Sequence, residues 1–245
     1  MIKDSAMLFV HGGPGLSSSY FKPWFDILTD KYDLLFYDQN YNIPENKKAI
    51  EALVEELYKK IHYAVSNYKT VLLFVHSWGV FVMLHVFYNY AGSGILDQVD
   101  KIILSNPSDS NWAEFCNSGD KLFAKMSQEE MNTISACSDG VQLMKLAIPY
   151  YVGSTEHVPN IVIDRYDRVA YDRISSEMEG YDIGYMVDSL PLGKVYTIYC
   201  ENDFEQPIGS PELYNKTKVF SFKSAGHFPF AEYPQEYFDL LRGIL

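Results

Sequence analysis

The chain is short of cysteine and of long hydrophobic runs, and both shortages narrow the kind of protein it is. Its three cysteines, Cys116, Cys137 and Cys200, are odd in number and widely spaced, so they suggest neither a disulfide framework nor a zinc cluster. No apolar run approaches the length that spans a bilayer, and residues 1–5 carry no signal-peptide pattern. We therefore expect a soluble cytoplasmic protein.

Positive charge is also scarce in this sequence. Lysine and arginine number 20 against 32 aspartates and glutamates, which gives a formal net charge of −12. Nucleic acids and anionic membranes select basic patches, so we expect neither as a partner. The six histidines and the carboxylates show no metal-ligand spacing, and we predict no metal and no cofactor.

What the chain does contain is an alternation of short apolar runs with segments of helical periodicity. We predict strands over residues 6–10, 32–37, 70–75, 101–105, 194–200 and 218–222. We predict helices over residues 18–29, 49–68, 78–90 and 235–244. This alternation predicts an α/β fold, with a mostly parallel sheet that is covered by helices on both faces.

The alternation is interrupted by residues 107–186, here called the helical segment. This stretch has several short helical patterns and no convincing strand. We interpret it as a cap, or lid, inserted over one end of the sheet. The predicted division is a core domain of residues 1–106 and 187–245, with the cap at 107–186.

A glycine-rich turn, His11–Gly15 (HGGPG), directly follows the first predicted strand. Glycines there free backbone N–H groups to point at a negatively charged oxygen. Such a loop forms half of the oxyanion hole in many hydrolases of strand-turn-helix architecture. The sequence therefore offers the backbone N–H of Gly13 as a candidate oxyanion donor.

A second motif, residues 75–79 (VHSWG), lies between a buried strand and a buried helix. This is the context of a nucleophile elbow, a sharp turn that exposes the Ser77 hydroxyl at a helix N-terminus. Gly79 meets the need for a small residue after the serine, whereas Val75 stands where a small residue is usual. The alternative is that Ser77 only caps the following helix.

Asp203 and His227 complete a possible catalytic set. Asp203 follows the strand over 194–200, and His227 lies between the last strand and the last helix. Each alone is more often a surface residue, but the order Ser, Asp, His is the one this architecture uses. We predict that Ser77 attacks an acyl carbon and His227 moves its proton. Asp203 would orient the imidazole, and the N–H groups of Trp78 and Gly13 would hold the oxyanion.

Three motifs together resemble the proline iminopeptidase branch of the α/β-hydrolase superfamily. They are HGGPG at 11–15, HSWG at 76–79 and GHFPFAEYP at 226–234, and the resemblance covers the predicted core domain. It implies the triad Ser77, Asp203 and His227, with an oxyanion hole at Gly13 and Trp78. The activity it implies is the release of an N-terminal residue from a short peptide.

The chain also departs from that family around the expected substrate. The family places glutamates in the cap and beside the catalytic aspartate to hold the free amine. Here Phe204 follows Asp203, and a glutamate comes only at Glu205. The candidate substrate-binding residues are His11, Gly12, Glu205, Tyr150 and Tyr151. We expect a small-molecule or short-peptide substrate, either an amide or an ester.

The start of the chain predicts an unusual sheet edge. The family places two strands before the glycine-loop strand, and only residues 1–5 precede it here. Residues 32–37 would then form an exposed apolar edge, which is a pairing hazard. We predict that a cap segment or a second subunit covers this edge.

Several functions compete at this point. An aminopeptidase would need a carboxylate within reach of a free amine near Ser77, whereas a carboxylesterase would have an apolar acyl pocket. A lyase or cofactor-free peroxidase on the same scaffold is a second class, because fold and triad do not decide the reaction. A catalytically silent binding protein is a third, for which Val75 would distort the elbow so that Ser77 cannot reach His227.

Overall fold

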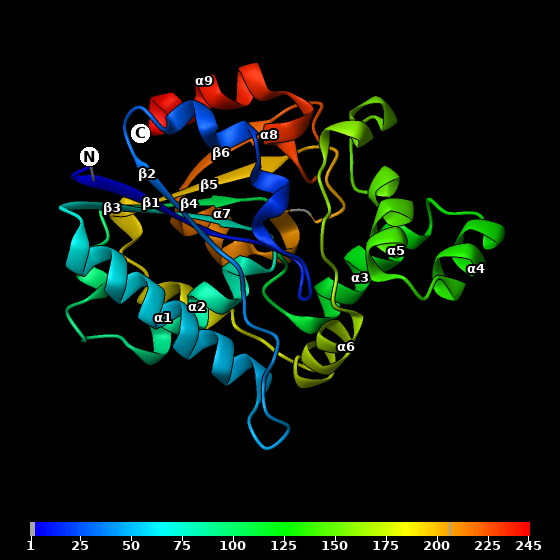
Figure 1. Ribbon diagram of the computed structural model, residues 1–245, viewed down its shortest axis with the longest axis horizontal. Coiled ribbons are helices and arrows are strands. Elements are labelled where there is room, and N and C mark those ends of the chain that lie inside the picture. The colour runs from blue at the N-terminus through cyan, green and yellow to red at the C-terminus, as the bar shows by residue number, and fades with distance from the viewer. Residues whose placement is uncertain (1–2, 206) are drawn as a thin grey trace.

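Six parallel strands form the centre of the computed structural model, which describes residues 3–205 and 207–245 (Figure 1). They are β1 Ser5–Val10, β2 Asp33–Tyr37, β3 Thr70–His76, β4 Lys101–Ser105, β5 Val195–Cys200 and β6 Lys218–Phe222. The strand order is β2-β1-β3-β4-β5-β6, and every neighbouring pair is parallel. The predicted parallel sheet is confirmed, with each strand boundary within one residue of the prediction.

Helices of unequal length connect these strands. The α-helices are α1 Ala49–Asn67, α2 Gly79–Asn89, α3 Trp112–Phe123, α4 Gln128–Ala136, α5 Gly140–Ala147, α6 Arg168–Glu177, α7 Pro211–Lys216, α8 Pro229–Glu232 and α9 Pro234–Ile244. Short 3-10 turns occupy Ser18–Phe21, Trp24–Leu28, Leu96–Gln98, Ile148–Tyr150, Thr155–Asn160, Gly184–Ser189, Leu192–Lys194 and Pro207–Gly209. In the part of the chain that the structure describes, no helix has the length and apolar character needed to cross a membrane.

The sheet is buried on both faces, which explains why its strands are continuous apolar runs rather than alternating ones. Successive side chains of a strand point to opposite faces. Leu8 and Val10 of β1 therefore belong to the core that contains α1 and α2. Met7 and Phe9 belong to the second core, on the side of α9. Figure 1 shows α9 above the sheet and α1 and α2 below it.

The helix predicted over 18–29 is wrong. The structure has two 3-10 turns there, Ser18–Phe21 and Trp24–Leu28, separated by Pro23. Lys22 is extended, with φ −97° and ψ 146°, because a residue before proline is pushed out of the helical region. The apolar spacing still succeeds in burying Phe21 and Phe25 against the sheet.

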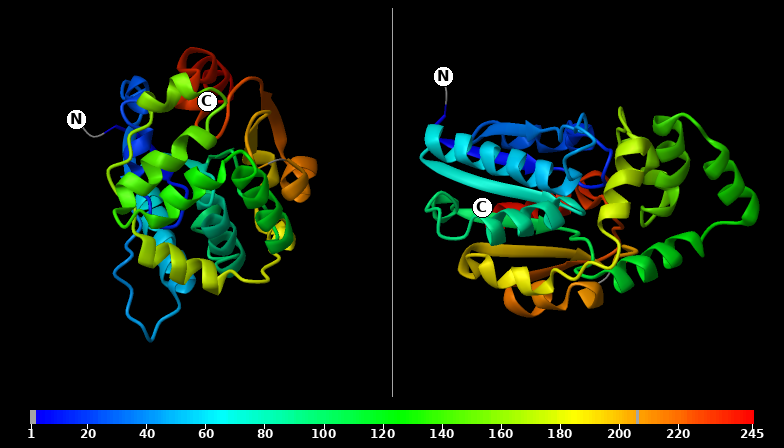
Figure 2. Two further views of the ribbon diagram at one scale, coloured as in Figure 1. Left: turned by 90° about the vertical axis from the view of Figure 1, so that its right-hand side faces the viewer. Right: turned by 90° about the horizontal axis from the view of Figure 1, so that it is seen from below.

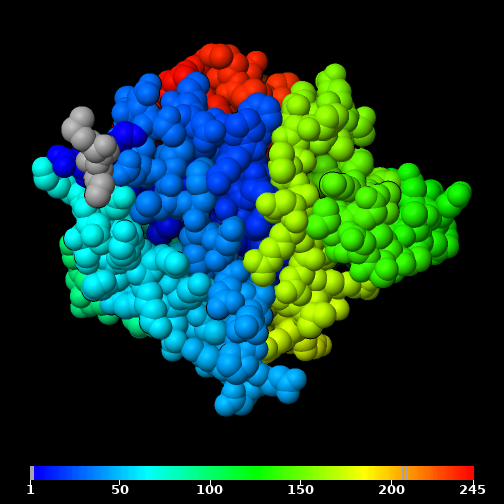
Figure 3. All heavy atoms as spheres, in the orientation of Figure 1, coloured from blue at the N-terminus to red at the C-terminus, as the bar shows by residue number. Residues whose placement is uncertain are grey.

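The helical segment contributes α3 to α6, which lie beyond the carboxyl ends of the strands (Figure 2). Figure 3 shows part of this segment, in yellow-green, running beside the blue N-terminal part of the chain. There the indole N–H of Trp24 donates to the carbonyl of Asn160 at 3.2 Å. The Asp167 N–H donates to the carbonyl of Gly15 at 2.8 Å. That this segment is a separate cap domain with boundaries at 107 and 186 stays a prediction.

The strand β2 is an edge of the sheet, and its partner there is β1 alone. Among the described residues, no hydrogen bond joins the helical segment to Asp33–Tyr37. Lysine side chains lie over two of its rings instead, Lys22 over Phe36 at 4.6 Å and Lys60 over Tyr37 at 5.7 Å. Charged side chains at an edge discourage further strand pairing. Cover by a second subunit stays a prediction.

Candidate active site

The candidate site lies at the point where the strand order reverses. From β1 the chain goes to β2 on one side, and it then returns to β3 on the other side of β1. The loops that follow β1 and β3 therefore diverge and leave a crevice at the carboxyl ends of these two strands. Gly12 and Gly13 follow β1 there, and Ser77 follows β3.

Ser77 occupies a sharp turn between β3 and α2. Its φ is +52°, in the left-handed region that a serine adopts only where the surroundings impose it. A Cβ on Gly12 would lie 2.6 Å from the Ser77 Cβ, and one on Gly79 would lie 2.7 Å from the carbonyl oxygen of His11. Val75 points into the core beside α1 and α2, fully buried, so its bulk stays clear of the turn.

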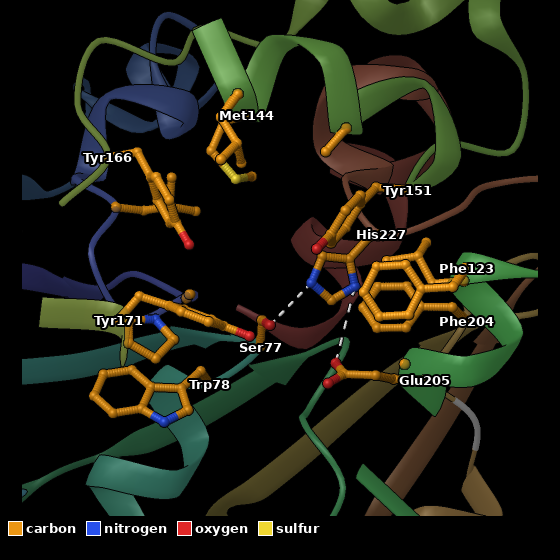
Figure 4. Close-up of a pocket in the computed structure, with 18 of the residues that line it drawn as sticks. Ser77, Trp78, Phe123, Met144, Tyr151, Tyr166, Tyr171, Phe204, Glu205 and His227 are labelled. Atoms are coloured by element: carbon orange, nitrogen blue, oxygen red, sulfur yellow. Dashed lines mark hydrogen bonds and ion pairs between the residues drawn. The ribbon is translucent and has the colours of Figure 1, made fainter. Parts of the chain in front are cut away.

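The structure brings Ser77, His227 and Asp203 into one hydrogen-bonded row. The Ser77 hydroxyl donates to Nε2 of His227 at 2.9 Å (Figure 4). The opposite ring nitrogen, Nδ1, lies 3.0 Å from both carboxylate oxygens of Asp203, to which its N–H donates. All three side chains are buried. A distorted elbow would have kept the hydroxyl out of this range.

Asn106, which sequence reasoning missed, supports Asp203. Its amide donates to Oδ2 of Asp203 at 2.7 Å and to the carbonyl of Gly226 at 3.2 Å. Asn106 directly follows β4, and its φ is +50°. The sequence signal for Asn106 was its position directly after a predicted strand. A polar residue at the carboxyl end of a parallel strand faces the same crevice as Ser77 and Asp203.

Glu232, a second missed residue, holds the loop of His227. Its buried carboxylate accepts the N–H of Gly226 at 3.0 Å, of Phe228 at 3.0 Å and of Gly153 at 2.7 Å. Glu232 belongs to the motif at 226–234, where a charged residue inside an apolar stretch was the signal. Such buried carboxylate bonds to backbone N–H groups are strong and keep a loop in one conformation.

His76 links the loops of the site without acting as a base. Its Nε2–H donates to the carbonyl of His227 at 2.8 Å, and its Nδ1 accepts the Tyr20 hydroxyl at 3.0 Å. The Tyr20 hydroxyl in turn accepts the N–H of Gly12. Burial holds the pKa of His76 well below its usual value, so the ring is neutral.

Gly13 and Trp78 border the same cavity as Ser77. Gly13 has a φ of +56°, and its carbonyl accepts the N–H of Leu16 at 3.2 Å, which closes the glycine turn. Within residues 3–205 and 207–245, neither the backbone N–H of Gly13 nor the backbone N–H of Trp78 takes part in a hydrogen bond. Both backbone donors, on residues that border the cavity, are therefore without a protein partner in the described part of the chain.

Two of the predicted substrate-binding residues lie outside the cavity. His11 is fully buried, with Nδ1 donating to the carbonyl of Gly12 at 2.9 Å and Nε2 accepting the N–H of Gln39 at 3.2 Å. Burial lowers the pKa of His11 to about 4. Tyr150 is bonded through its hydroxyl to Glu130, away from the cavity.

The other predicted residues, Gly12, Glu205 and Tyr151, do line the cavity. Glu205 lies on the far side of the His227 ring from Ser77 (Figure 4), with Oε2 at 4.0 Å from Nδ1. It is only 4% exposed, and Oε2 has no hydrogen-bond partner among the described residues. Burial, Asp109 and Asp203 all raise the pKa of Glu205 well above its usual value, which disfavours the charged form of this carboxyl.

The cavity has a volume of about 530 Å³, a size typical of small-molecule sites. Most of its lining is aromatic or aliphatic and comes from both the sheet edge and α3 to α6. Tyr166, Tyr171 and Met144 surround the open side of Ser77 in Figure 4. Within the described residues, no group of three or more histidine, cysteine or acidic side chains has a metal-binding arrangement.

Solved structures with the same fold are hydrolases. A serine hydrolase from Cycloclasticus zankles has 17% identity and a TM-score of 0.69, over 98% of this chain and 89% of that one. A proline iminopeptidase from Mycobacterium smegmatis has 14% identity and a TM-score of 0.66, over 99% and 92%. An enol-lactonase from Burkholderia xenovorans has 13% identity and a TM-score of 0.66, over 98% and 91%.

No family model and no curated protein matches the sequence. At these identities the likeness shows the fold, which is that of the α/β-hydrolases. The neighbours include peptidases, esterases and lactonases, so they do not select one reaction.

Proposed function

We propose that this protein is a cofactor-free serine hydrolase that cleaves an ester or an amide through an acyl-enzyme on Ser77. The observation that carries the proposal is the continuous row from the Ser77 hydroxyl through the His227 imidazole to the Asp203 carboxylate, with contacts of 2.9 and 3.0 Å. This arrangement has a nucleophile, a base within hydrogen-bond reach and an acid that orients the base.

The reaction would proceed in two steps. In the first, Ser77 Oγ bonds to the substrate's acyl carbon while His227 Nε2 takes the hydroxyl proton. The leaving alcohol or amine then departs with that proton, which leaves an acyl group on Ser77. In the second step, water attacks the acyl carbon and gives a proton to His227. The bond between Ser77 Oγ and the acyl carbon then breaks, His227 returns the proton to Oγ, and the acid is released. Asp203 holds the imidazole in the correct tautomer and stabilises its charged form.

The negative charge that develops on the acyl oxygen needs its own donors. Trp78 and Gly13 would supply them through backbone N–H groups that border the cavity. Each such donor contributes about 3–4 kcal/mol of transition-state stabilisation in comparable enzymes. The N-terminal end of α2 points its dipole at the same place, which adds to this effect.

We favour an ester or amide with an uncharged acyl part over a peptide with a free N-terminus. A free ammonium group needs an accessible, ionised carboxylate near Ser77. Glu205 is enclosed, and burial together with two neighbouring carboxylates raises its pKa, which disfavours its ionised form. The apolar lining of the cavity supports the esterase alternative.

Release of an N-terminal residue is the second candidate function. One observation favours it, namely that Oε2 of Glu205 borders the cavity without a hydrogen-bond partner among the described residues. An ammonium group that reached it would satisfy this atom and lower its pKa. The silent-binding alternative has no such support, because it expects Ser77 beyond reach of His227.

Labelling with a fluorophosphonate probe tests the hydrolase proposal. We expect the wild type to label and Ser77→Ala to remain unlabelled. The matched control is Ser93→Ala, an exposed serine remote from the cavity, which keeps full labelling. Failure of a well-folded wild type to label would contradict the proposal. Rates for p-nitrophenyl acetate and for proline p-nitroanilide then separate the esterase from the aminopeptidase.

A further inference from the structure

We propose that the natural substrate carries one extended, uncharged aliphatic chain, which binds along α3 in the groove between α3 and the pair α4 and α5. This inference rests on the hydrolase function proposed above and names its substrate class. Three features of the cavity carry it: its lining along α3, the apolar wall opposite, and the placement of its charges.

The first feature is a row of residues on one side of α3 and its continuation. Phe115, Gly119, Leu122, Phe123 and Met126 all border the cavity that contains Ser77. Their spacing of four, three, one and three residues keeps them on one helix face. The row spans about 16 Å at the rise of an α-helix. The lining of the cavity therefore extends along α3, which suits a chain better than a compact ring.

The backbone of α3 also leaves room for an occupant. A Cβ on Gly119 would meet no atom within 4 Å, so this glycine faces open space rather than a neighbouring element. Phe123 is 53% exposed although it borders the cavity. A large aromatic side chain left exposed on the wall of the cavity that contains Ser77 is typical of a surface that a ligand covers.

The second feature is the wall opposite α3. Met144 and Leu143 of α5 and Ile134 of α4 face the same cavity. Methionine is unbranched and adapts its shape to irregular apolar partners. Met126 on one wall and Met144 on the other are both well covered, at 8% and 7% exposed. Such walls would pack around a flexible apolar chain without requiring hydrogen bonds of a fixed direction.

The third feature is the distribution of charge. The charged groups that border the cavity beyond Ser77 are Asp120, Arg168 and Asp172, and all three are exposed at its rim. Arg168 lies 4.0 Å from Asp172. Between this rim and Ser77, the walls contributed by α3, α4 and α5 are mostly aromatic and aliphatic. A charged group held between those walls would lose its hydration without gaining a partner, so the groove favours an uncharged chain.

Two series of esters test the proposal with the wild-type protein. In one, p-nitrophenyl esters run from acetate to decanoate; in the other, n-alkyl acetates run from methyl to decyl. We expect kcat/KM to rise in one series by up to about fourfold for each CH₂ that becomes buried. The rise stops once the chain passes Met126. The series that rises shows whether the chain lies on the acyl side or on the alcohol side.

Two variants then place the chain in the groove. Gly119→Trp fills the space beside α3. In the series that rises, we expect it to lower the ratio of kcat/KM for the eight-carbon chain to kcat/KM for the shortest chain at least tenfold. Phe123→Asp puts a charge on an exposed position of the same wall and lowers the ratio in the same direction. Val169→Trp is the matched control, because Val169 is 79% exposed on α6 and outside the cavity, so its ratio equals that of the wild type.

The outcomes separate the two proposals. A folded wild type that neither labels with a fluorophosphonate nor cleaves any ester overturns the hydrolase function itself. A wild type that labels and cleaves acetate, but shows rates that fall with chain length in both series, overturns only the aliphatic-chain inference. An equal ratio in Gly119→Trp, Phe123→Asp and wild type also overturns it, because the chain would then lie elsewhere.

Discussion

The carboxyl edge of the sheet and the helical segment build the two sides of one cavity with opposite kinds of packing. Most of α2, which follows Ser77, is buried in the core. In contrast, α4 of the helical segment has no buried residue at all. At the sheet edge, buried side chains near Ser77 are held by specific hydrogen bonds, such as the bond from Asn106 to Asp203 and the bond from Tyr20 to His76.

The two kinds of packing suit two different tasks, which are the positioning of reacting atoms and the binding of an apolar group. Reacting atoms must be held within a fraction of an ångström, which only a rigid, fully bonded scaffold provides. Binding an apolar group needs area and adaptability instead, which loosely packed helices with methionines provide. The positions near Ser77 should therefore respond to small changes by losing activity, and those on α3 to α5 should tolerate them.

A pair of glycine substitutions tests this contrast and has the largest expected effect. Gly12→Ala places a Cβ 2.6 Å from the Cβ of Ser77, so the elbow or the glycine loop must move. We expect kcat/KM for an ester to fall by at least ~100-fold, as misplaced reacting groups do. Gly119→Ala meets no atom within 4 Å on α3. It should stabilise the helix by up to ~1 kcal/mol.

Steady-state kinetics and urea unfolding on both variants provide the check. Equal activity losses in Gly12→Ala and Gly119→Ala would remove the distinction between the two sides of the cavity.

Truncating one aliphatic side chain in the sheet and one in the helical segment should give the next largest effect, measured on the free energy of unfolding. Leu73 in β3 is fully buried, and Leu73→Ala should cost about 2–5 kcal/mol of unfolding free energy because a cavity remains. Ile134 on α4 is only half-buried, and Ile134→Ala should cost less than about 1 kcal/mol. Denaturant unfolding at neutral pH measures both. A comparable cost at Ile134 would mean that α4 belongs to the stable core.

Asp109, between the two regions, links stability to pH. Burial raises its pKa from 3.8 to about 6. The folded protein therefore keeps this proton where the unfolded chain has lost it. The stability that neutral Asp109 contributes is complete below pH 3.8 and is lost as the pH rises through about 6.

Asp109→Asn keeps a neutral side chain of the same shape. We expect it to match the wild type at pH 4 and to exceed its unfolding free energy at pH 8 by up to about 3 kcal/mol. Chemical denaturation of the wild type and of Asp109→Asn at pH 4 and pH 8 measures this difference in unfolding free energy. A difference that is the same at both would contradict a raised pKa at this position.

The edge strand β2 lies outside both regions and carries the smallest expected effect. Its outer side has no strand partner among the described residues. The sequence-based prediction of a second subunit on this edge implies a dimer that dissociates on dilution. Light scattering over a range of protein concentrations measures this directly. A monomer at every concentration would show that residues 32–37 are left to solvent and that the lysines over Phe36 and Tyr37 protect them.

The sequence alone determined the sheet and the three residues at its edge. Continuous apolar runs such as residues 70–75 are a local signal, because burial on both faces requires every side chain of the strand to be apolar. Ser77, Asp203 and His227 were predicted to form the catalytic set because they follow such runs in the sequence. Pro23 was also a local signal, and neglecting it produced the wrong helix over 18–29.

Only the tertiary structure decided what surrounds these residues. Asn106 and Asp203 are 97 positions apart, and no local periodicity predicts that one amide donates to the other. The raised pKa of Glu205 likewise depends on burial and on Asp109 and Asp203 nearby. The groove along α3 exists because α4 and α5 return to face it. Contacts of this kind depend on where distant segments meet, whereas strands and helices depend on the pattern within each segment.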